Sequence, residues 1–381
     1  MNLINNSSSD RFHSIDMLRA IMMVLGVFFH SAVIFCHSKN IQDWPVFDKS
    51  PSYFFDFVVG ITHSFRMHLF FFVSGFSTSI LYLKKGSKLM LINRFKRIVL
   101  PFLLSYVIIS PLISYFSALI NNSEIGNPIV KLFHLDYTFF LSQPIYHLWF
   151  LYYLIYFILL GWIFEKLFEQ KLTLTEKIKS FIEKITRNFW LRFVFLSSLI
   201  LIYFLYTGKN HFYSPLKFEI SPSAFLVYFV FYAFGWFVHK NKSLHLFSSE
   251  HPTRLITIGL VFYIISNLNV ILGFSNFKYV QFTASAFSHV LFILGFLSLI
   301  LKKFNFQSKI STFILNSSYW IYLVHIIFIF AMYYLIDDIN LPVYLKFITV
   351  FFGASLLCIV SYLLLVKKTF IGVFLNGKKI K

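Results

Sequence analysis

An arginine and three histidines lie inside apolar stretches of the chain, where ionisable side chains are costly and usually mark a functional site. Arg19 and His30 are eleven residues apart. In a helix this spacing places them within about 20° of the same face and about 16 Å apart along the axis. His68 and His325 belong to two other apolar stretches, and both come to roughly the depth of His30, about 20 Å from the same end, when residues are counted from the helix ends. We therefore predict that side chains from three helices meet at one level inside a helix bundle.

An imidazole exchanges a proton near neutral pH, because its pKa is ordinarily about 6.5, and this makes His30 a candidate catalyst. Its shared face with Arg19 favours that role over the alternative of a histidine that only hydrogen-bonds between helices. Arg66 belongs to the same stretch as His68, and two roles stay open for it, that of a site residue and that of a side chain which snorkels to lipid headgroups. Asp16 precedes Arg19 by three residues and is predicted to orient its guanidinium.

A metal site is not expected from this pattern. The chain has two cysteines, Cys36 and Cys358, and both lie in apolar stretches. The histidines have no ligand-motif spacing, and no carboxylate inside the apolar stretches completes a familiar metal site.

The composition is that of a membrane protein, with 58% hydrophobic and 13% charged residues, against roughly a quarter charged in a soluble domain. A spanning helix needs about 20 mostly apolar residues, and such stretches recur along the whole chain. We predict an all-α integral membrane protein with about ten transmembrane helices, at residues 17–36, 57–83, 98–120, 147–165, 190–207, 222–239, 254–274, 285–302, 311–335 and 342–366.

The net charge of +19 indicates orientation in a bilayer, not a nucleic-acid partner. With the N-terminus in the cytoplasm, 25 of the 34 lysines and arginines fall in inner segments and seven in outer loops, as the positive-inside rule requires. The C-terminus is then cytoplasmic as well. No internal repeat is visible, so residues 1–381 are predicted to form one domain, and the oligomeric state stays open.

One segment between the predicted spans has a helical pattern of a different kind. A capping-box pattern at residues 173–176 is followed by apolar residues at helical spacing. We predict a cytoplasmic interfacial amphipathic helix at residues 169–189.

Several motifs, taken together and in order, resemble those of the acyltransferase-3 family of membrane O-acyltransferases. They cover the chain from about residue 12 to residue 335. They are Arg19 and His30 with ten residues between them, LFFFVSGF at 69–76, RFKRIVLP at 94–101, HLWFL at 147–151 and SYWIYLVH at 318–325.

The resemblance implies transfer of an acyl group from cytosolic acyl-CoA to a hydroxyl group of an extracytoplasmic glycan. Succinyl-CoA and acetyl-CoA are the expected donors, and no permanently bound cofactor is expected. The motifs are most similar to those of a subfamily associated with succinylating periplasmic glucans. The expected location is the bacterial inner membrane, with a multi-pass topology. The alternative function is a proton-coupled transporter or flippase for a glycan or an acyl carrier, which can also bury arginine and histidine.

The resemblance also suggests roles for individual residues. His30 is the expected general base, with an acyl-histidine intermediate as the competing mechanism. Arg66 is favoured for stabilising the tetrahedral oxyanion, with His325 as a further catalytic side chain. Phosphates of coenzyme A are expected at Arg19, Arg94 and Arg97. Substrate contacts are expected at His68, Tyr322, His147 and Trp149, with the last two at the outer mouth.

Overall fold

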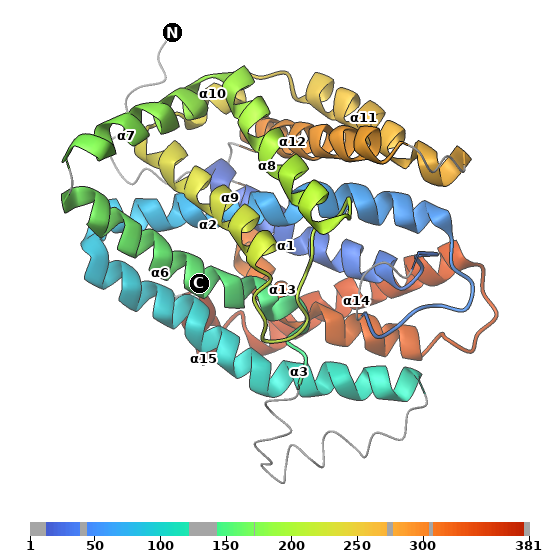
Figure 1. Cartoon of the computed structure of the whole chain (residues 1–381). Coiled ribbons are helices and arrows are strands. Elements are labelled where there is room, and N and C mark those ends of the chain that lie inside the picture. Colours follow the sequence, from blue (N-terminus) through green and yellow to red (C-terminus); the bar gives the residue numbers. More distant parts are fainter. Residues whose placement is uncertain are drawn as a thin grey trace.

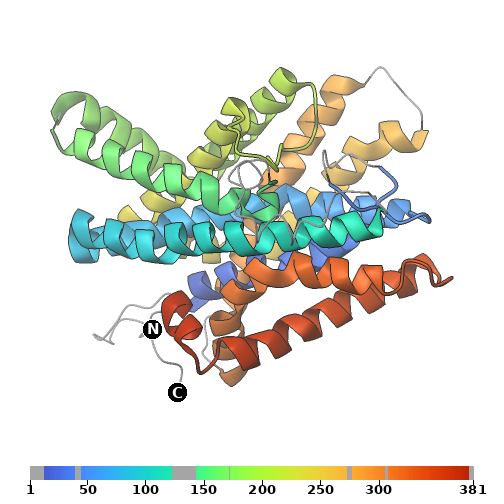
Figure 2. The ribbon, with the colours of Figure 1, turned by 90° about the horizontal axis from the view of Figure 1, so that it is seen from below.

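The computed structural model describes residues 13–38, 44–121, 143–170, 172–272, 277–304 and 308–376, apart from the side chains at 168–170, 172–176, 178 and 269–272. The described chain forms helices and no strand, which confirms the all-α prediction. Figures 1 and 2 show the long helices lying side by side as a bundle, with α11 and α12 along one edge and α13 and α14 along the opposite one.

The helix bounds are as follows, in chain order: α1 (His13–Val33), α2 (Tyr53–Arg94), the π-helical turn η1 (Phe95–Val99), α3 (Leu100–Ile120), the 3₁₀ turn η2 (Tyr146–Leu148), α6 (Trp149–Gln170), α7 (Leu172–Arg187), α8 (Phe189–Thr207), α9 (Pro222–Lys240), α10 (Leu244–Ser248), α11 (Pro252–Leu272), α12 (Lys278–Lys303), α13 (Lys309–Tyr334), α14 (Val343–Leu365) and α15 (Phe370–Asn376). The central helix is α2, which packs against α1, α9 and α12, while α13 packs against α1, α3 and α14.

Eight stretches of the described chain are long and apolar enough to cross a membrane, so the predicted count of ten is not reproduced. One of the eight, Tyr53–Ile120, contains two predicted spans on either side of Gly86, where φ of +74° interrupts the helix. The predicted span at 254–274 overlaps α11, whose apolar part, Pro252–Leu268, is shorter than a typical span.

Two glycines set the distance between α2 and α9. A Cβ atom on Gly75 would lie 1.9 Å from the carbonyl oxygen of Tyr232, and one on Gly235 would lie 1.9 Å from the carbonyl oxygen of Phe72. The two backbones therefore touch at a reciprocal crossing that only glycine permits, as is common between membrane helices. This contact fixes the axis of α2, which carries Arg66.

The predicted amphipathic segment at 169–189 overlaps α7. The capping-box side chains at 173–176 lie outside the described side chains. Farther along α7, the apolar ring of Phe181 is 57% exposed. That α7 lies on a cytoplasmic membrane surface stays a prediction.

A buried ion pair connects the segment between α1 and α2 to α13 and α14. The Asp48 carboxylate accepts hydrogen bonds from Lys346 Nζ on α14 at 3.1 Å and from the Tyr333 hydroxyl on α13 at 3.0 Å. Lys346 Nζ also donates to the carbonyl oxygen of Asp337 at 3.0 Å. The segment from residue 44 to residue 52 is therefore held by two helices that are remote from it in sequence.

The first prediction compares two lysines at this end of the bundle. Lys346→Met leaves the Asp48 carboxylate buried without its cation, so we expect the free energy of unfolding to fall by about 3–5 kcal/mol. Lys49→Met is the matched control, because Lys49 is 73% exposed and its nearest carboxylate oxygens lie 3.6 and 3.8 Å away. Its removal should cost about 1 kcal/mol or less. Thermal unfolding in detergent measures both, and equal effects would contradict the structural role of Asp48.

The second prediction concerns orientation. Figure 1 shows the α2–α3 junction and the α13–α14 connection at opposite ends of the bundle. In a chain without Cys36 and Cys358, we expect a cysteine at Asp338 to react with a membrane-impermeant maleimide in intact cells. A cysteine at Lys88 should react only after the cells are permeabilised. Both native side chains are exposed, and the opposite labelling pattern would reverse the predicted topology.

Candidate active site

A small cavity lies where α1, α2, η2 and α13 meet. His30 and Gly26 line it from α1, Arg66 from α2, His147 from η2, and Tyr322 and His325 from α13. Its volume is about 20 Å³, enough for about one water molecule. The structure thus gathers side chains that lie up to about 300 residues apart in the chain around one enclosed space.

Three imidazole rings meet at this cavity. The ring centroids of His30 and His325 are 5.2 Å apart, those of His147 and His325 4.8 Å, and those of His30 and His147 6.5 Å. Histidines from three segments do meet at one level, but the third is His147, not His68. Among the described residues, no group of three histidine, cysteine or acidic side chains is placed to hold a metal ion.

Main-chain carbonyl groups fix two of these rings. His325 Nδ1–H donates to the carbonyl oxygens of Tyr322 at 2.7 Å and Ile321 at 3.1 Å, and His147 Nε2–H donates to that of Leu323 at 3.1 Å. The opposite ring nitrogens, His325 Nε2 and His147 Nδ1, are buried without a hydrogen-bond partner in the described structure, as is His30 Nδ1. Buried polar atoms are normally satisfied, so these three ring nitrogens are available to hydrogen-bond a polar ligand.

Arg66 supplies a buried positive charge beside these rings. Its guanidinium carbon lies 4.3 Å from the centre of the Phe29 ring, and none of the ion pairs among the described residues involves it. A Cβ atom on Gly26 would lie 3.1 Å from Arg66 Nη1 and 3.6 Å from His325 Nε2, so glycine leaves room for both. Arg66 is only 8% exposed, which argues against the snorkelling alternative, while its role as a site residue stays a prediction.

Trp44, in the segment between α1 and α2, packs against His30 at the small cavity. Its ring stacks on that of His30, with centroids 5.0 Å apart and planes 15° apart, and it also contacts Phe330. The Asp48 ion pair holds the segment that carries it. The sequence analysis missed Trp44, because a lone tryptophan in a loop gives no spacing signal.

The predicted donor-binding arginines gather at another place. Arg19 makes the predicted ion pair with Asp16, at 3.3 Å, and interacts electrostatically with Arg94 and Arg97. Arg97 Nη1 donates to the carbonyl oxygen of Leu375 at 2.6 Å. Three helical segments, α1, α2 and η1, therefore form one cationic cluster, named here the arginine cluster.

His68 is not part of the small cavity, in contrast to the predicted substrate contact. It is fully buried among the rings of Phe212, Tyr228 and Phe231, with centroids 4.5, 5.3 and 4.7 Å away. The depth estimate was insufficient because residues two apart in a helix point about 200° apart. Arg66 and His68 therefore face different neighbours.

His147 and Trp149 are also placed differently from the prediction of an outer mouth. Their exposed fractions are 4% and 5%, and both line the small cavity together with Tyr322. The Tyr322 hydroxyl donates to the carbonyl oxygen of His147 at 2.9 Å. The start of an apolar stretch was interpreted as a membrane edge, but η2 lies inside the bundle.

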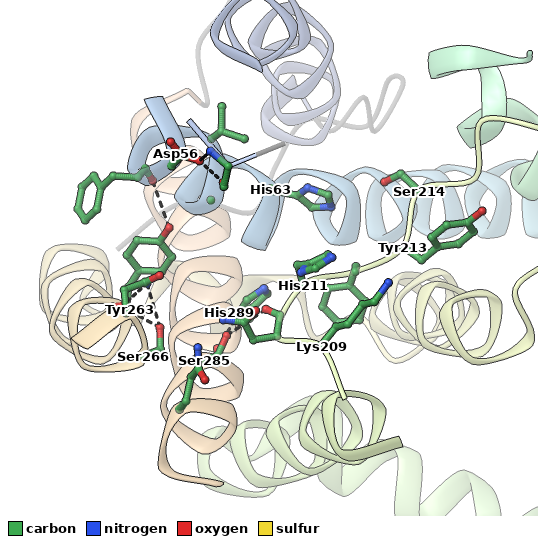
Figure 3. Close-up of a pocket in the computed structure, with 18 of the residues that line it drawn as sticks. Asp56, His63, Lys209, His211, Tyr213, Ser214, Tyr263, Ser266, Ser285 and His289 are labelled. Atoms are coloured by element: carbon green, nitrogen blue, oxygen red, sulfur yellow. Dashed lines mark hydrogen bonds between the residues drawn. The ribbon is translucent and has the colours of Figure 1, made fainter. Parts of the chain in front are cut away.

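A second, larger cavity of about 1000 Å³ lies beside the first and is shown in Figure 3. His63, His211 and His289 line it from α2, the α8–α9 connection and α12. None of these three histidines is among the site residues predicted from the sequence. Burial and the nearby Lys209 lower the pKa of His211.

Comparison with known proteins agrees with the family resemblance of the sequence motifs. The family model described as "Acyltransferase domain", of the acyltransferase-3 family, matches residues 12–366. Glucans biosynthesis protein C of Salmonella heidelberg (strain SL476) is 25% identical over 329 residues, which are 83% of this chain and 81% of that protein. Glucans biosynthesis protein C of Escherichia coli O139:H28 (strain E24377A / ETEC) is 25% identical over 331 residues, 84% of this chain and 83% of that protein. No solved structure gives a significant match.

The third prediction uses a pair of buried arginines. Arg66→Met removes a charge that has no carboxylate partner among the described residues, so we expect acyl transfer to fall by about 10²–10³-fold without loss of thermal stability. Arg192 is the matched control, because its guanidinium lies 4.1 Å from the centre of the Phe247 ring and is paired with Glu250. Arg192→Met leaves the Glu250 carboxylate buried without its cation. The free energy of unfolding should therefore fall by about 3–5 kcal/mol, while the folded fraction keeps its activity.

The stability loss of the control variant, Arg192→Met, should also depend on pH. Burial raises the pKa of Glu250 to about 7, against the opposing effect of Arg192. Without Arg192 the carboxyl group becomes protonated more easily on folding, so the loss of stability should be smaller near pH 6 than near pH 8. If Arg66→Met were as unstable as Arg192→Met, its role would be structural.

Proposed function

Since the chain belongs to the acyltransferase-3 family, we propose that it transfers a succinyl or acetyl group from acyl-CoA to a hydroxyl group of an extracytoplasmic glycan. One observation carries the proposal: Arg66 and the unpartnered nitrogens of His30 and His325 surround one enclosed cavity. A fixed cation and proton acceptors are what acyl transfer needs, because a proton leaves the attacking hydroxyl while an oxyanion develops.

In the proposed reaction the hydroxyl oxygen attacks the thioester carbonyl as His30 takes the hydroxyl proton. The tetrahedral intermediate then expels the thiolate of coenzyme A, which receives the proton from His30, and the products are the ester and free coenzyme A. Arg66 stabilises the oxyanion. This task falls to Arg66 because the Nδ1–H of His325 is donated to carbonyl oxygens, which leaves neutral His325 without a proton on Nε2.

His325 then has a different proposed role from that of an oxyanion donor. Its ring is held by main-chain carbonyl groups, and its Nε2 lone pair lies in the same cavity as His30. A fixed lone pair beside His30 stabilises the imidazolium that forms when His30 takes a proton. His30 itself is stacked on Trp44, which limits rotation of its ring.

The proposed donor enters from the arginine cluster. Acyl-CoA is strongly anionic, and guanidinium groups bind phosphate through paired hydrogen bonds. Arg19 is separated from His30 by about 16 Å of helix, which is comparable with the length of an extended pantetheine arm. Phosphates at Arg19, Arg94 and Arg97 would thus place the thioester near His30.

The proposed acceptor follows from the curated relatives. Two of them are named Glucans biosynthesis protein C, which makes a glucan the first acceptor to test. The proposed location is the bacterial inner membrane, with the arginine cluster facing the cytoplasm. The transporter or flippase alternative is less economical, because the family model describes an acyltransferase.

The fourth prediction tests His30 as the base. His30→Gln keeps a hydrogen-bonding side chain but cannot accept the proton, so we expect transfer to fall by about 10²–10⁴-fold while the protein still inserts and accumulates. His245→Gln is the control, because His245 is exposed on α10 and donates only to the carbonyl oxygen of Lys242 in the described structure. The assay follows radiolabelled succinyl-CoA and acetyl-CoA with protein reconstituted in lipid and glucose oligosaccharides as acceptors.

Two results of this assay would count against the proposal. Near wild-type transfer by His30→Gln would make His30 a packing residue and move the base to His325. Absence of transfer from either acyl-CoA by the wild-type protein, together with transfer from another acyl donor, would overturn the donor assignment.

A further inference from the structure

The larger cavity is lined by residues none of which lines the small cavity. Six separate segments form its wall, namely the α1–α2 connection, α2, α8, the α8–α9 connection, α11 and α12. In Figure 3 the imidazoles of His63, His211 and His289 lie near one another at its centre, with Tyr263 at one side and Tyr213 at the other. Its volume of about 1000 Å³ is at the upper end of small-molecule sites.

We propose that this cavity binds the acceptor of the reaction, as an uncharged oligosaccharide that presents one hydroxyl group toward His30. The proposal rests on the function proposed above. It assigns the acceptor to residues other than those suggested by the sequence, of which His68, His147, Trp149 and Tyr322 do not line this cavity.

The charges of the lining favour a neutral ligand. Apart from histidines, Asp56 and Lys209 are the ionisable acid and base among its described lining residues. The Asp56 carboxylate already accepts hydrogen bonds from the backbone N–H groups of His37 and Ser38, both at 2.8 Å, and from the Ser38 hydroxyl. The lowered pKa of His211 keeps its imidazole neutral at physiological pH. The described lining of the larger cavity contains no cluster of cations, comparable with the arginine cluster, that could bind the phosphates of acyl-CoA.

The side chains of the lining fit a polyhydroxylated ligand. Tyrosine rings provide flat apolar faces of the kind that contact the C–H face of a sugar, and amide, hydroxyl and imidazole groups provide donors and acceptors between them. The buried Nε2 atom of His63 has no hydrogen-bond partner in the described structure, so a polar group is available to a ligand there. The rest of the polar and aromatic lining includes Tyr53, Tyr213, Tyr263, Asn210, Asn267 and Gln281.

The Phe29 ring contacts one histidine of the larger cavity and one of the small cavity. The Phe29 ring centroid is 5.7 Å from that of His63, which lines the larger cavity, and 4.9 Å from that of His30, which lines the small one. The guanidinium of Arg66 covers the same ring. In the proposal, a hydroxyl group held beside His63 approaches His30 past the Phe29 ring, next to the guanidinium of Arg66.

The test uses two threonines that share one helical hydrogen bond. Thr207 lines the larger cavity at the end of α8, and Thr349 lies on α14 outside it. Each hydroxyl donates to the carbonyl oxygen four residues earlier at 2.9 Å, so both substitutions remove that bond. Thr207→Trp also removes two longer contacts, at 3.4 Å, with the backbone N–H and carbonyl groups of Lys209. Thr207→Trp fills the cavity without touching His30, Arg66 or the arginine cluster, whereas Thr349→Trp adds the same bulk elsewhere.

The probes are cellohexaose, laminarihexaose and maltohexaose, three glucose hexasaccharides that differ in linkage. We expect Thr207→Trp to raise KM for the best of these acceptors by about tenfold or more, which corresponds to about 1.4 kcal/mol. Its KM for acyl-CoA and its slow acyl-CoA hydrolysis without acceptor should stay at the wild-type level. Equilibrium binding of the same radiolabelled hexasaccharide, measured without donor, should weaken equally, and Thr349→Trp should match the wild type in every measurement.

The outcomes separate this inference from the proposed function. If the wild type transfers acyl groups and Thr207→Trp keeps the acceptor KM of Thr349→Trp, the cavity is not the acceptor site although the function stands. If the wild type binds a hexasaccharide that Thr207→Trp does not bind, but transfers nothing to it, the site stands and the function fails. Absence of both hexasaccharide binding and transfer in the wild type overturns both.

Discussion

The buried guanidinium of Arg66 is the feature on which the rest of the active site depends. A charge without a carboxylate is expensive inside a protein, and the surroundings reduce that cost only in part, through the face of Phe29 and the space left by Gly26. The neighbouring imidazoles of His30 and His325 keep nitrogens unsatisfied as well. Such an arrangement persists only where the framework fixes it, and here the glycine crossing of α2 with α9 and the ion pair of Asp48 provide that rigidity.

Helical periodicity predicted the part of the site that depends on one helix at a time. The rise of an α-helix placed His30 and His325 at one level, and both line the small cavity, whereas the common face of Arg19 and His30 stays a prediction. His68 was misplaced because depth alone does not give the direction in which a side chain points. Trp44 was missed because loops have no periodicity, and its place over His30 depends on an ion pair between residues about 300 positions apart.

The composition of the sequence predicted the helical architecture better than the pattern of apolar segments predicted the number of spans. The all-helical architecture and repeated apolar helices were predictable, because each backbone polar group must be satisfied within a membrane. The exact number of spans stays a prediction, because Tyr53–Ile120 contains two predicted spans on either side of Gly86 and the apolar part of α11 is short. Likewise, His147 begins an apolar stretch but lies in the interior, because the 3₁₀ turn η2 packs against α3 and α6.

The small volume of the reaction cavity has a consequence for turnover. About 20 Å³ cannot contain a thioester carbonyl and a sugar hydroxyl together. For the proposed reaction, the arrangement of Arg66, His30 and His325 would therefore be a resting state, and each cycle would include an expansion in which side chains or helices separate. Within a bilayer such an expansion would work against lateral pressure, so the proposed reaction should depend on the physical state of the surrounding lipid.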